Sequence, residues 1–198
     1  MSPEEAAAVV LAVIYLVLAI REIRWCWVAG FASALLYLDV FFRASLYMEA
    51  ALQVFYMAMA VYGWWCWRPP GAAAQDAGDT RANLPDIQRR PATWHALAIA
   101  GVVVLAAVNG FILHRTTDAA WPYLDSFISW GSILTTWMVA KKLLENWCYW
   151  LILDSLTLGL ALERGLHLTA VLFGLYLVLV VVGWRRWLLR WRATTAPA

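Results

Sequence analysis

Hydrophobic residues occur in long runs separated by short polar or charged segments, and this pattern dominates the sequence. A membrane-spanning helix needs about 17–25 predominantly apolar residues, and seven runs lie near that length. The 3.6-residue period within them is weak, as expected for helices that face lipid or other helices on most sides. The pattern predicts an all-α integral membrane protein with seven transmembrane helices, near residues 5–20, 25–42, 47–67, 94–113, 122–140, 147–162 and 166–187.

The third and seventh runs share one sequence pattern, 120 residues apart. Residues 46–67 and 166–187 are identical at 8 of 22 positions without a gap, and both contain Gly-Trp-x-x-Trp, which begins at Gly63 and at Gly183. Unrelated apolar helices often share Leu, Val and Ala, but they do not share glycine and tryptophan in register. An internal repeat in a membrane protein is typical of a transporter whose substrate site lies between the halves.

The repeat divides the chain into five segments. Each repeat holds three spans, so the additional helix between them returns the chain to its starting side and makes the two repeats parallel. Parallel repeats are related by an axis along the membrane normal, with a pathway between them. We therefore predict a 3-1-3 arrangement with a first triple-helix repeat at 1–68, a cytoplasmic linker at 69–91, a linking transmembrane helix at 92–116, a second triple-helix repeat at 121–188 and a cytoplasmic tail at 189–198.

The basic residues predict the orientation of the chain. With the N-terminus outside, all 15 lysines and arginines except Arg43, Arg115 and Arg164 fall on the cytoplasmic side, as the positive-inside rule requires. This predicts a multi-pass membrane protein with its N-terminus outside and its C-terminus in the cytoplasm. The net charge of +2 thus reflects topology and does not indicate nucleic-acid binding. A content of 64% hydrophobic and 14% charged residues excludes a soluble domain.

The chain lacks the residues that the chemistry of several functional classes requires. The seventh span has no lysine for a retinal Schiff base, and no G-x-x-x-x-G-K-[ST] motif for ATP is present. The three histidines are scattered, and the three cysteines form no CxxC pair or Cys/His cluster. The sequence therefore predicts no cofactor, no metal site and no enzymatic activity.

One face of the sixth span gathers polar and aromatic residues. Trp147, Trp150 and Asp154 are spaced i, i+3 and i+7, and Asn146 lies one turn from Trp150. A carboxylate near mid-membrane is energetically costly and usually faces a cavity. These four residues are candidates for substrate binding. The alternative is that Asp154 belongs to a structural hydrogen-bond network and that Trp147 belongs to the interfacial aromatic belt.

The third and seventh spans supply the other candidates. Gln53 is the only amide on its span, and a buried glutamine needs a helix or a ligand as its partner. Tyr56 and its repeat mate Tyr176 occupy equivalent positions, where either can bind a ligand or join two helices. Tryptophan faces beside a carboxylate suit a flat cation, and the membrane region lacks the arginine cluster that a phosphorylated substrate needs.

The chain resembles the PnuC-type vitamin transporters. The similarity rests on Glu145-Asn146-Trp147-x-x-Trp150-x-x-x-Asp154, on Gly165-Leu166 and Gly183-Trp184-x-x-Trp187, and in the first half on Leu52-Gln53 and Gly63-Trp64. The resemblance implies a 3-1-3 fold similar to that of SWEET sugar carriers and a homotrimer. It also implies inward facilitated diffusion of nicotinamide riboside, a vitamin B3 form used in NAD biosynthesis, with trapping by a separate cytoplasmic riboside kinase.

The resemblance places the family's tryptophan pair on Trp147 and Trp150 and its glutamine on Gln53. The chain departs from the family at His167 and Phe173, where tyrosine is frequent. We therefore expect a uniporter for nicotinamide riboside in the lipid bilayer of the bacterial inner membrane. The alternatives are a related carrier for thiamine, another nucleoside or a sugar, and a non-transporting membrane scaffold or receptor.

Overall fold

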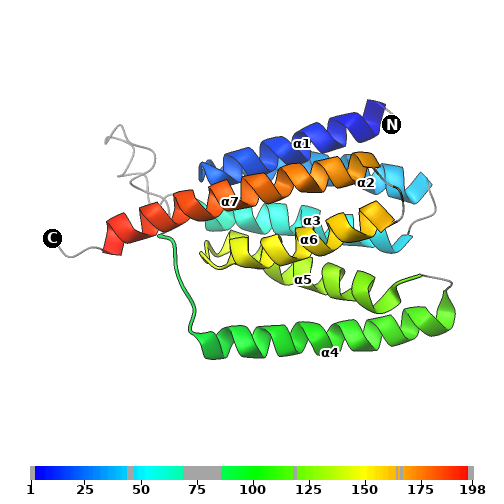
Figure 1. The fold of residues 1–198 in the computed structure, drawn as a ribbon. Coiled ribbons are helices and arrows are strands. Elements are labelled where there is room, and N and C mark those ends of the chain that lie inside the picture. Colours follow the sequence, from blue (N-terminus) through cyan, green and yellow to red (C-terminus); the bar gives the residue numbers. More distant parts are fainter. Residues whose placement is uncertain are drawn as a thin grey trace.

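The computed structural model describes residues 3–43, 47–68, 86–117, 120–163, 165 and 167–195. Over these residues the chain forms seven α-helices and no β-sheet, which confirms the all-α prediction and the number of helices (Figure 1). The helices are α1 (Pro3–Ile20), α2 (Cys26–Arg43), α3 (Tyr47–Cys66), α4 (Ala92–Thr116), α5 (Pro122–Ala140), α6 (Asn146–Glu163) and α7 (His167–Thr195).

The helices have the lengths of membrane spans. By length and composition alone, three of the described helices can cross a membrane: α2, α4 and the Thr169–Thr195 part of α7. The remaining four contain 18 to 20 residues, close to the ~20 that a span requires. Helix α7 has 29 residues and continues beyond the bundle, so part of the 189–198 segment is helical (Figure 1).

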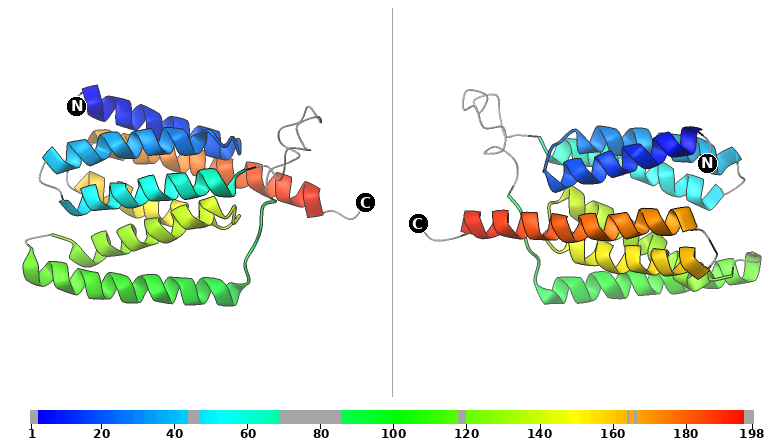
Figure 2. Two further views of the ribbon diagram at one scale, coloured as in Figure 1. Left: turned by 180° about the vertical axis from the view of Figure 1, so that it is seen from behind. Right: turned by 45° about the horizontal axis from the view of Figure 1, so that its top comes forward.

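Six helices form two groups that are equivalent under the repeat. Helix α2 packs against α1 and α3, and α6 packs against α5 and α7. The groups meet where α3 contacts α5 and where α1 contacts α7, so exchanging the two groups reproduces the same contacts. Helix α4 packs along α5 at the edge of the bundle (Figures 1 and 2).

The repeated Gly-Trp-x-x-Trp packs each group internally. A Cβ atom on Gly63 would overlap the ring of Trp27, and a Cβ atom on Gly183 would overlap the ring of Trp147. Each of these rings then meets the second tryptophan of the motif edge to face, with ring centroids 5.5 Å apart for Trp27 and Trp67 in the first group. The equivalent centroids in the second group are 5.3 Å apart. Glycine is needed here because only its backbone admits an indole so close to the helix.

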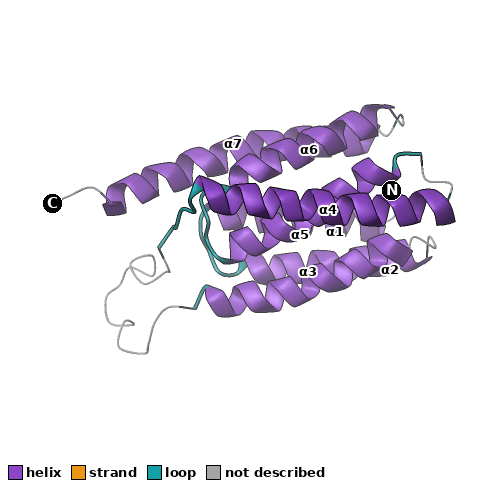
Figure 3. Ribbon diagram, turned by 90° about the horizontal axis from the view of Figure 1, so that it is seen from below, coloured by secondary structure: helices purple, strands orange, loops and turns teal. Residues whose placement is uncertain are grey.

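The end of the predicted linker is attached to the bundle. Residues 69–85 lie outside the described residues, whereas 86–91 run along the loop between α5 and α6 (Figure 3, loops in teal). The Gln88 amide donates to the Lys142 carbonyl over 3.0 Å, and the Leu144 amide donates to the Gln88 carbonyl over 2.9 Å. Ile87 is buried in the core. This part of the linker is therefore a structural strap on the second group.

Candidate functional site

A cavity of about 1290 Å³ lies between the two three-helix groups. Its lining comes from α1, α2 and α3 on one side and from α5, α6 and α7 on the other. Helix α4 contributes no lining residue among those described. The cavity thus lies at the junction of the repeats, where the internal repeat predicts a substrate pathway.

Six of the seven candidate residues line this cavity. Asp154, Gln53 and Trp147 have at most 9% of their surface exposed, and the others are partly buried. They come from three helices, α3, α6 and α7, so residues more than 100 positions apart in sequence face the same space. The six are Gln53, Tyr56, Trp147, Trp150, Asp154 and Tyr176.

Asp154 is a buried acidic residue of the cavity lining. It is 5% exposed, and no lysine or arginine in the described part of the chain lies within ion-pair distance of it. Tyr56 and Tyr176 are both close enough to interact electrostatically with its carboxylate. The Tyr56 hydroxyl is also hydrogen-bonded to Ser132 of α5. The two repeat-related tyrosines therefore lie near one carboxylate, for which the first repeat has alanine at the equivalent position.

The two tryptophans of α6 differ in their surroundings. Trp147 is 2% exposed and is held between Gly183 and Trp187, and its indole N–H has no hydrogen-bond partner among the described residues. Trp150 lies one turn further along the helix and is only partly buried. Trp147 therefore has a packing role as well as a place on the cavity wall, whereas the Trp150 ring is accessible for stacking.

Asn146 is the one candidate that is absent from the cavity lining. It is the first residue of α6 and is fully buried. Its side-chain amide donates to the Leu143 carbonyl over 2.6 Å, while its Oδ1 atom has no partner among the described residues. This geometry holds the loop that precedes α6.

Aromatic residues of the first repeat that sequence reasoning missed also line the cavity. Tyr15 fills the space beside Gly30, where an added Cβ atom would lie 2.9 Å from the Tyr15 ring. Trp27 contacts Tyr15 edge to face at 5.8 Å, and Tyr37 is another lining residue. Trp27 is the repeat mate of Trp147, and this correspondence is the sequence signal that could have identified it. Tyr15 and Tyr37 have no such signal, because their repeat mates are threonines.

The repeats place different side chains at equivalent points of the cavity. Trp150 and Asp154 correspond to Gly30 and Ala34 in the first repeat, and all four line the same space. Gln53 of α3 likewise corresponds to a lining phenylalanine of α7, Phe173. The framework is nearly symmetric, but Trp150, Asp154 and Gln53 have no like residue at the equivalent point of the other repeat.

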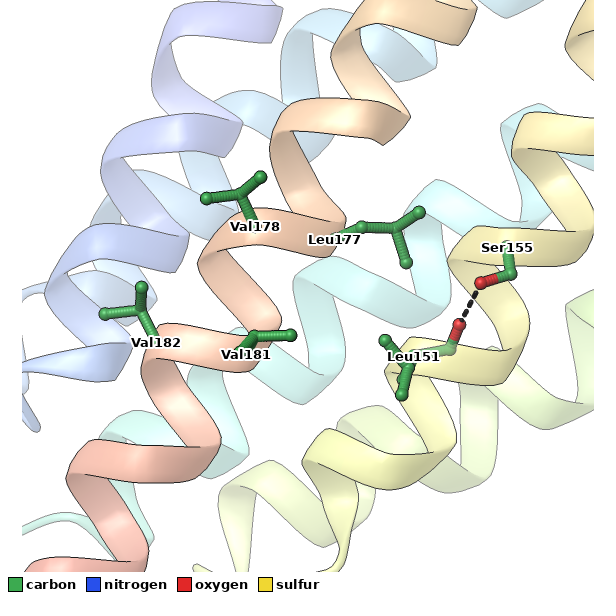
Figure 4. Close-up of a pocket in the computed structure, with 6 residues that line it drawn as sticks. All are labelled: Leu151, Ser155, Leu177, Val178, Val181 and Val182. Carbon is green, nitrogen blue, oxygen red and sulfur yellow. Dashed lines mark hydrogen bonds between the residues drawn. The ribbon is translucent and has the colours of Figure 1, made fainter.

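A second hollow, of about 420 Å³, lies between α6 and α7 outside the junction of the repeats. Figure 4 shows its lining, which consists of five aliphatic residues and Ser155. The Ser155 hydroxyl donates to the Leu151 carbonyl over 2.6 Å, so this polar side chain is already satisfied. The groove therefore offers apolar contact and is not the candidate site.

A family model described as "Nicotinamide mononucleotide transporter" matches residues 2–189 of the chain. The chain belongs to this family. The crystal structure of the vitamin B3 transporter PnuC is similar in fold, with a TM-score of 0.76, 21% identity, and coverage of 96% of this chain and 82% of the other. The predicted resemblance to PnuC-type transporters is thereby confirmed.

Two transporters that are similar to this chain differ in their named substrates. The riboflavin/roseoflavin transporter RibM of Streptomyces davaonensis is 29% identical over 95% of this chain and 85% of its own length. The nicotinamide riboside transporter PnuC of Escherichia coli is 21% identical over 80% of this chain and 74% of its own length. Membership in the family thus indicates a transporter, whereas the named substrates of its relatives differ.

Proposed function

We propose that the protein is a uniporter that carries nicotinamide riboside into the cytoplasm by facilitated diffusion. The observation that supports this substrate is the pairing of Trp150 with Asp154 in a cavity whose described lining contains no lysine or arginine. The nicotinamide ring of the riboside is a flat pyridinium cation. An accessible indole face and a carboxylate are the two groups that such a ring needs.

The absence of lysine and arginine from the described lining also disfavours a phosphorylated cargo. A phosphate monoester carries about two negative charges at neutral pH and is usually bound by arginine or lysine. A buried carboxylate repels it. The cavity therefore favours the riboside over the mononucleotide that gives the family its name. In this scheme the protein itself performs no chemistry, and a separate cytoplasmic kinase phosphorylates the riboside and so prevents its return.

The transport mechanism follows from the position of the cavity. We infer a 3-1-3 arrangement in which the α1–α3 and α5–α7 groups rock about the cavity and open it to one side at a time. Helix α4 would serve to make the two groups parallel. In the bacterial inner membrane, the end of the bundle that carries the 21–25 and 141–145 loops would face the cytoplasm, because most of the basic residues lie there. We also propose that the protein forms a homotrimer in the bilayer, as the family resemblance implies.

Riboflavin is the second candidate substrate. The similarity to RibM is higher and more extensive than that to the Escherichia coli PnuC. The cavity of about 1290 Å³ also exceeds the 300–1,000 Å³ of common small-molecule sites, which suits a three-ring flavin. Thiamine, other nucleosides and sugars are weaker candidates. A buried carboxylate on a large cavity wall also favours a carrier over a non-transporting scaffold or receptor.

Uptake into proteoliposomes that lack a kinase tests the proposed function. We expect labelled nicotinamide riboside to equilibrate across the membrane without accumulating, and unlabelled riboside to compete. Riboflavin and thiamine serve as competing substrates in the same assay. Saturable riboflavin uptake without riboside uptake would contradict the proposed substrate and identify riboflavin instead. Accumulation driven by a proton or sodium gradient would exclude uniport, and no saturable uptake of any vitamin would exclude the carrier.

Trp150→Ala should weaken substrate binding by about 1–3 kcal/mol, the value typical of base–aromatic stacking. The ring of Trp150 is partly exposed on the cavity wall, so its removal deletes a stacking surface. Isothermal titration of the purified protein with nicotinamide riboside measures this change. Trp65→Ala is the control, because Trp65 is 67% exposed and lies outside the cavity lining. Equal affinity of the Trp150 variant and the wild type would remove Trp150 from the site.

A further inference from the structure

Two charged residues at equivalent positions of the repeats meet at one end of the bundle. Glu22 follows α1 and Lys142 follows α5, and they are 120 residues apart, as the repeat requires. The Lys142 Nζ atom donates to the Glu22 carboxylate over 2.7 Å, and the side chains are 1% and 4% exposed respectively. One group of helices is thus joined to the other by a buried ion pair on the repeat axis.

The backbone at both positions adopts a conformation that favours glycine. The φ angle is 56° at Glu22 and 52° at Lys142, in the left-handed region. The first helix ends with Glu22 N–H donating to the Ala19 carbonyl and Ile23 N–H donating to the Leu18 carbonyl. The bonds at Lys142 are equivalent, so both helices end in the same motif, where glycine is the usual residue. Charged residues in place of glycine indicate that the side chains themselves are needed.

A third residue extends the pair across the junction. Arg190 of α7 lies 2.7 Å from the second oxygen of Glu22, so this carboxylate binds two cations of the opposite group. The ammonium of Lys142 also lies 4.7 Å from the centre of the Trp67 ring. Burial lowers the pKa of Lys142, while Glu22 acts in the opposite direction and favours the charged form. Without Glu22, Lys142 would be a buried cation with no carboxylate.

Tryptophans next to this ion pair link the groups in the same reciprocal way. The Trp67 indole of the first group donates to the Ala140 carbonyl of the second over 3.1 Å. The Trp187 indole of the second group donates to the Ala19 carbonyl of the first over 3.3 Å. Both side chains are fully buried, and their ring centroids are 6.3 Å apart. Together with the ion pair, they close this end of the junction.

We propose that Glu22, Lys142 and Arg190 form the cytoplasmic gate of the transporter, closed in this structure and broken when the cavity opens to the cytoplasm. This inference rests on the proposed function, which supplies the orientation in the membrane and the alternating opening of the cavity. An ion pair suits a gate because the attraction between buried ions is largely offset by their desolvation, so a closed and a hydrated open state can be close in free energy. Removing one partner alone leaves the remaining charge uncompensated when closed, which shifts the population toward the open state.

Cys26 provides a reporter that does not depend on the substrate. It is the first residue of α2, fully buried and close to the ion pair. In a background in which Cys66 and Cys148 are serine, a membrane-impermeant maleimide is applied to the cytoplasmic face of inverted vesicles. We expect Cys26 to react slowly in the otherwise wild-type chain and roughly tenfold faster in Glu22→Gln, as for a shift of ~1.4 kcal/mol in the gate equilibrium.

A milder variant and an exchange of charges keep the test decisive. Arg190→Gln removes only the outer cation, and we expect an intermediate rate. Exchanging all three charges (E22K, K142E and R190E together) should restore slow labelling. Arg89→Gln is the matched control, because its ion pair with Glu145 lies at the same end and joins the linker to the second group only. Thermal unfolding of each variant identifies general loss of structure.

The outcomes separate the gate from the transported substrate. Faster labelling in Glu22→Gln, reversed by the charge exchange, supports the gate even if no tested vitamin is transported. Unchanged labelling in both Glu22→Gln and Arg190→Gln would overturn the gate, whatever the uptake assay gives. Fast labelling that persists in the folded charge-exchange variant would also overturn it, because the ion pair would then not control access.

Discussion

Replacing Asp154 with asparagine is expected to weaken binding of nicotinamide riboside by about 1.5–3 kcal/mol, or roughly 10- to 150-fold. The substitution preserves the shape of the side chain and removes its charge. Because the described lining of the cavity holds no lysine or arginine, Asp154 has no such cation to neutralise it and can pair with a cationic ligand. Titration calorimetry with the purified protein measures the loss, and counterflow in proteoliposomes measures the corresponding fall in transport.

The same variant distinguishes the two candidate substrates. Riboflavin carries no net charge, so its affinity should change little when the carboxylate becomes an amide. Asp39→Asn is the control, since Asp39 is an exposed carboxylate paired with Arg43 at the other end of the bundle. Equal loss of affinity for riboside and flavin would mean that Asp154 acts by hydrogen bonding or packing. No loss for either would place substrate elsewhere.

The repeated glycines should be intolerant of even a methyl group. We expect Gly63→Ala and Gly183→Ala each to lower the free energy of unfolding by about 1–3 kcal/mol, because the new Cβ atom overlaps an indole ring on the neighbouring helix. Both Trp27 and Trp147 are 2% exposed and have no room to withdraw. Thermal unfolding in detergent, followed by tryptophan fluorescence and size-exclusion chromatography, measures the loss.

Two other helical glycines are matched controls. Gly101 of α4 and Gly159 of α6 have no atom within 4 Å of a built Cβ, so alanine meets open space there. The helix propensity of alanine exceeds that of glycine by up to ~1 kcal/mol, and these variants should be neutral or more stable. Destabilisation of all four variants by the same amount would show that the steric contact with tryptophan does not matter.

The broad fold was predictable because it depends on local features of the sequence, namely the apolar runs and the internal repeat. Each long apolar run became one helix, and the 120-residue offset identified the helices that occupy equivalent places. Helix ends were less predictable, because they depend on side chains and loops from distant segments. Helix α7 continues to Thr195 although its apolar run stops near 187, and residues 86–91 are held by backbone bonds to a loop more than 50 residues away.

Part of the candidate cavity lining was predictable where polar residues interrupt apolar helices. Gln53, Trp150 and Asp154 stand out on their spans and line the cavity. Tyr15 does not stand out, because an aromatic residue in an apolar run is equally suited to lipid, to packing and to a binding site. The ion pair of Glu22 with Lys142 was also invisible, since both residues read as ordinary loop charges until the two helix ends are placed side by side.

The unequal lining of the two repeats has a consequence for how a molecule binds. A cavity with full two-fold symmetry would offer every ligand two poses of equal energy, related by half a turn. Here one wall carries Trp150 and Asp154, and the opposite wall carries Gly30 and Ala34. In the proposed mechanism, an asymmetric vitamin therefore has a single preferred pose, which it keeps while the two helix groups rock around it. In this proposal the duplicated framework allows the motion, and the unequal lining keeps the bound substrate in one orientation.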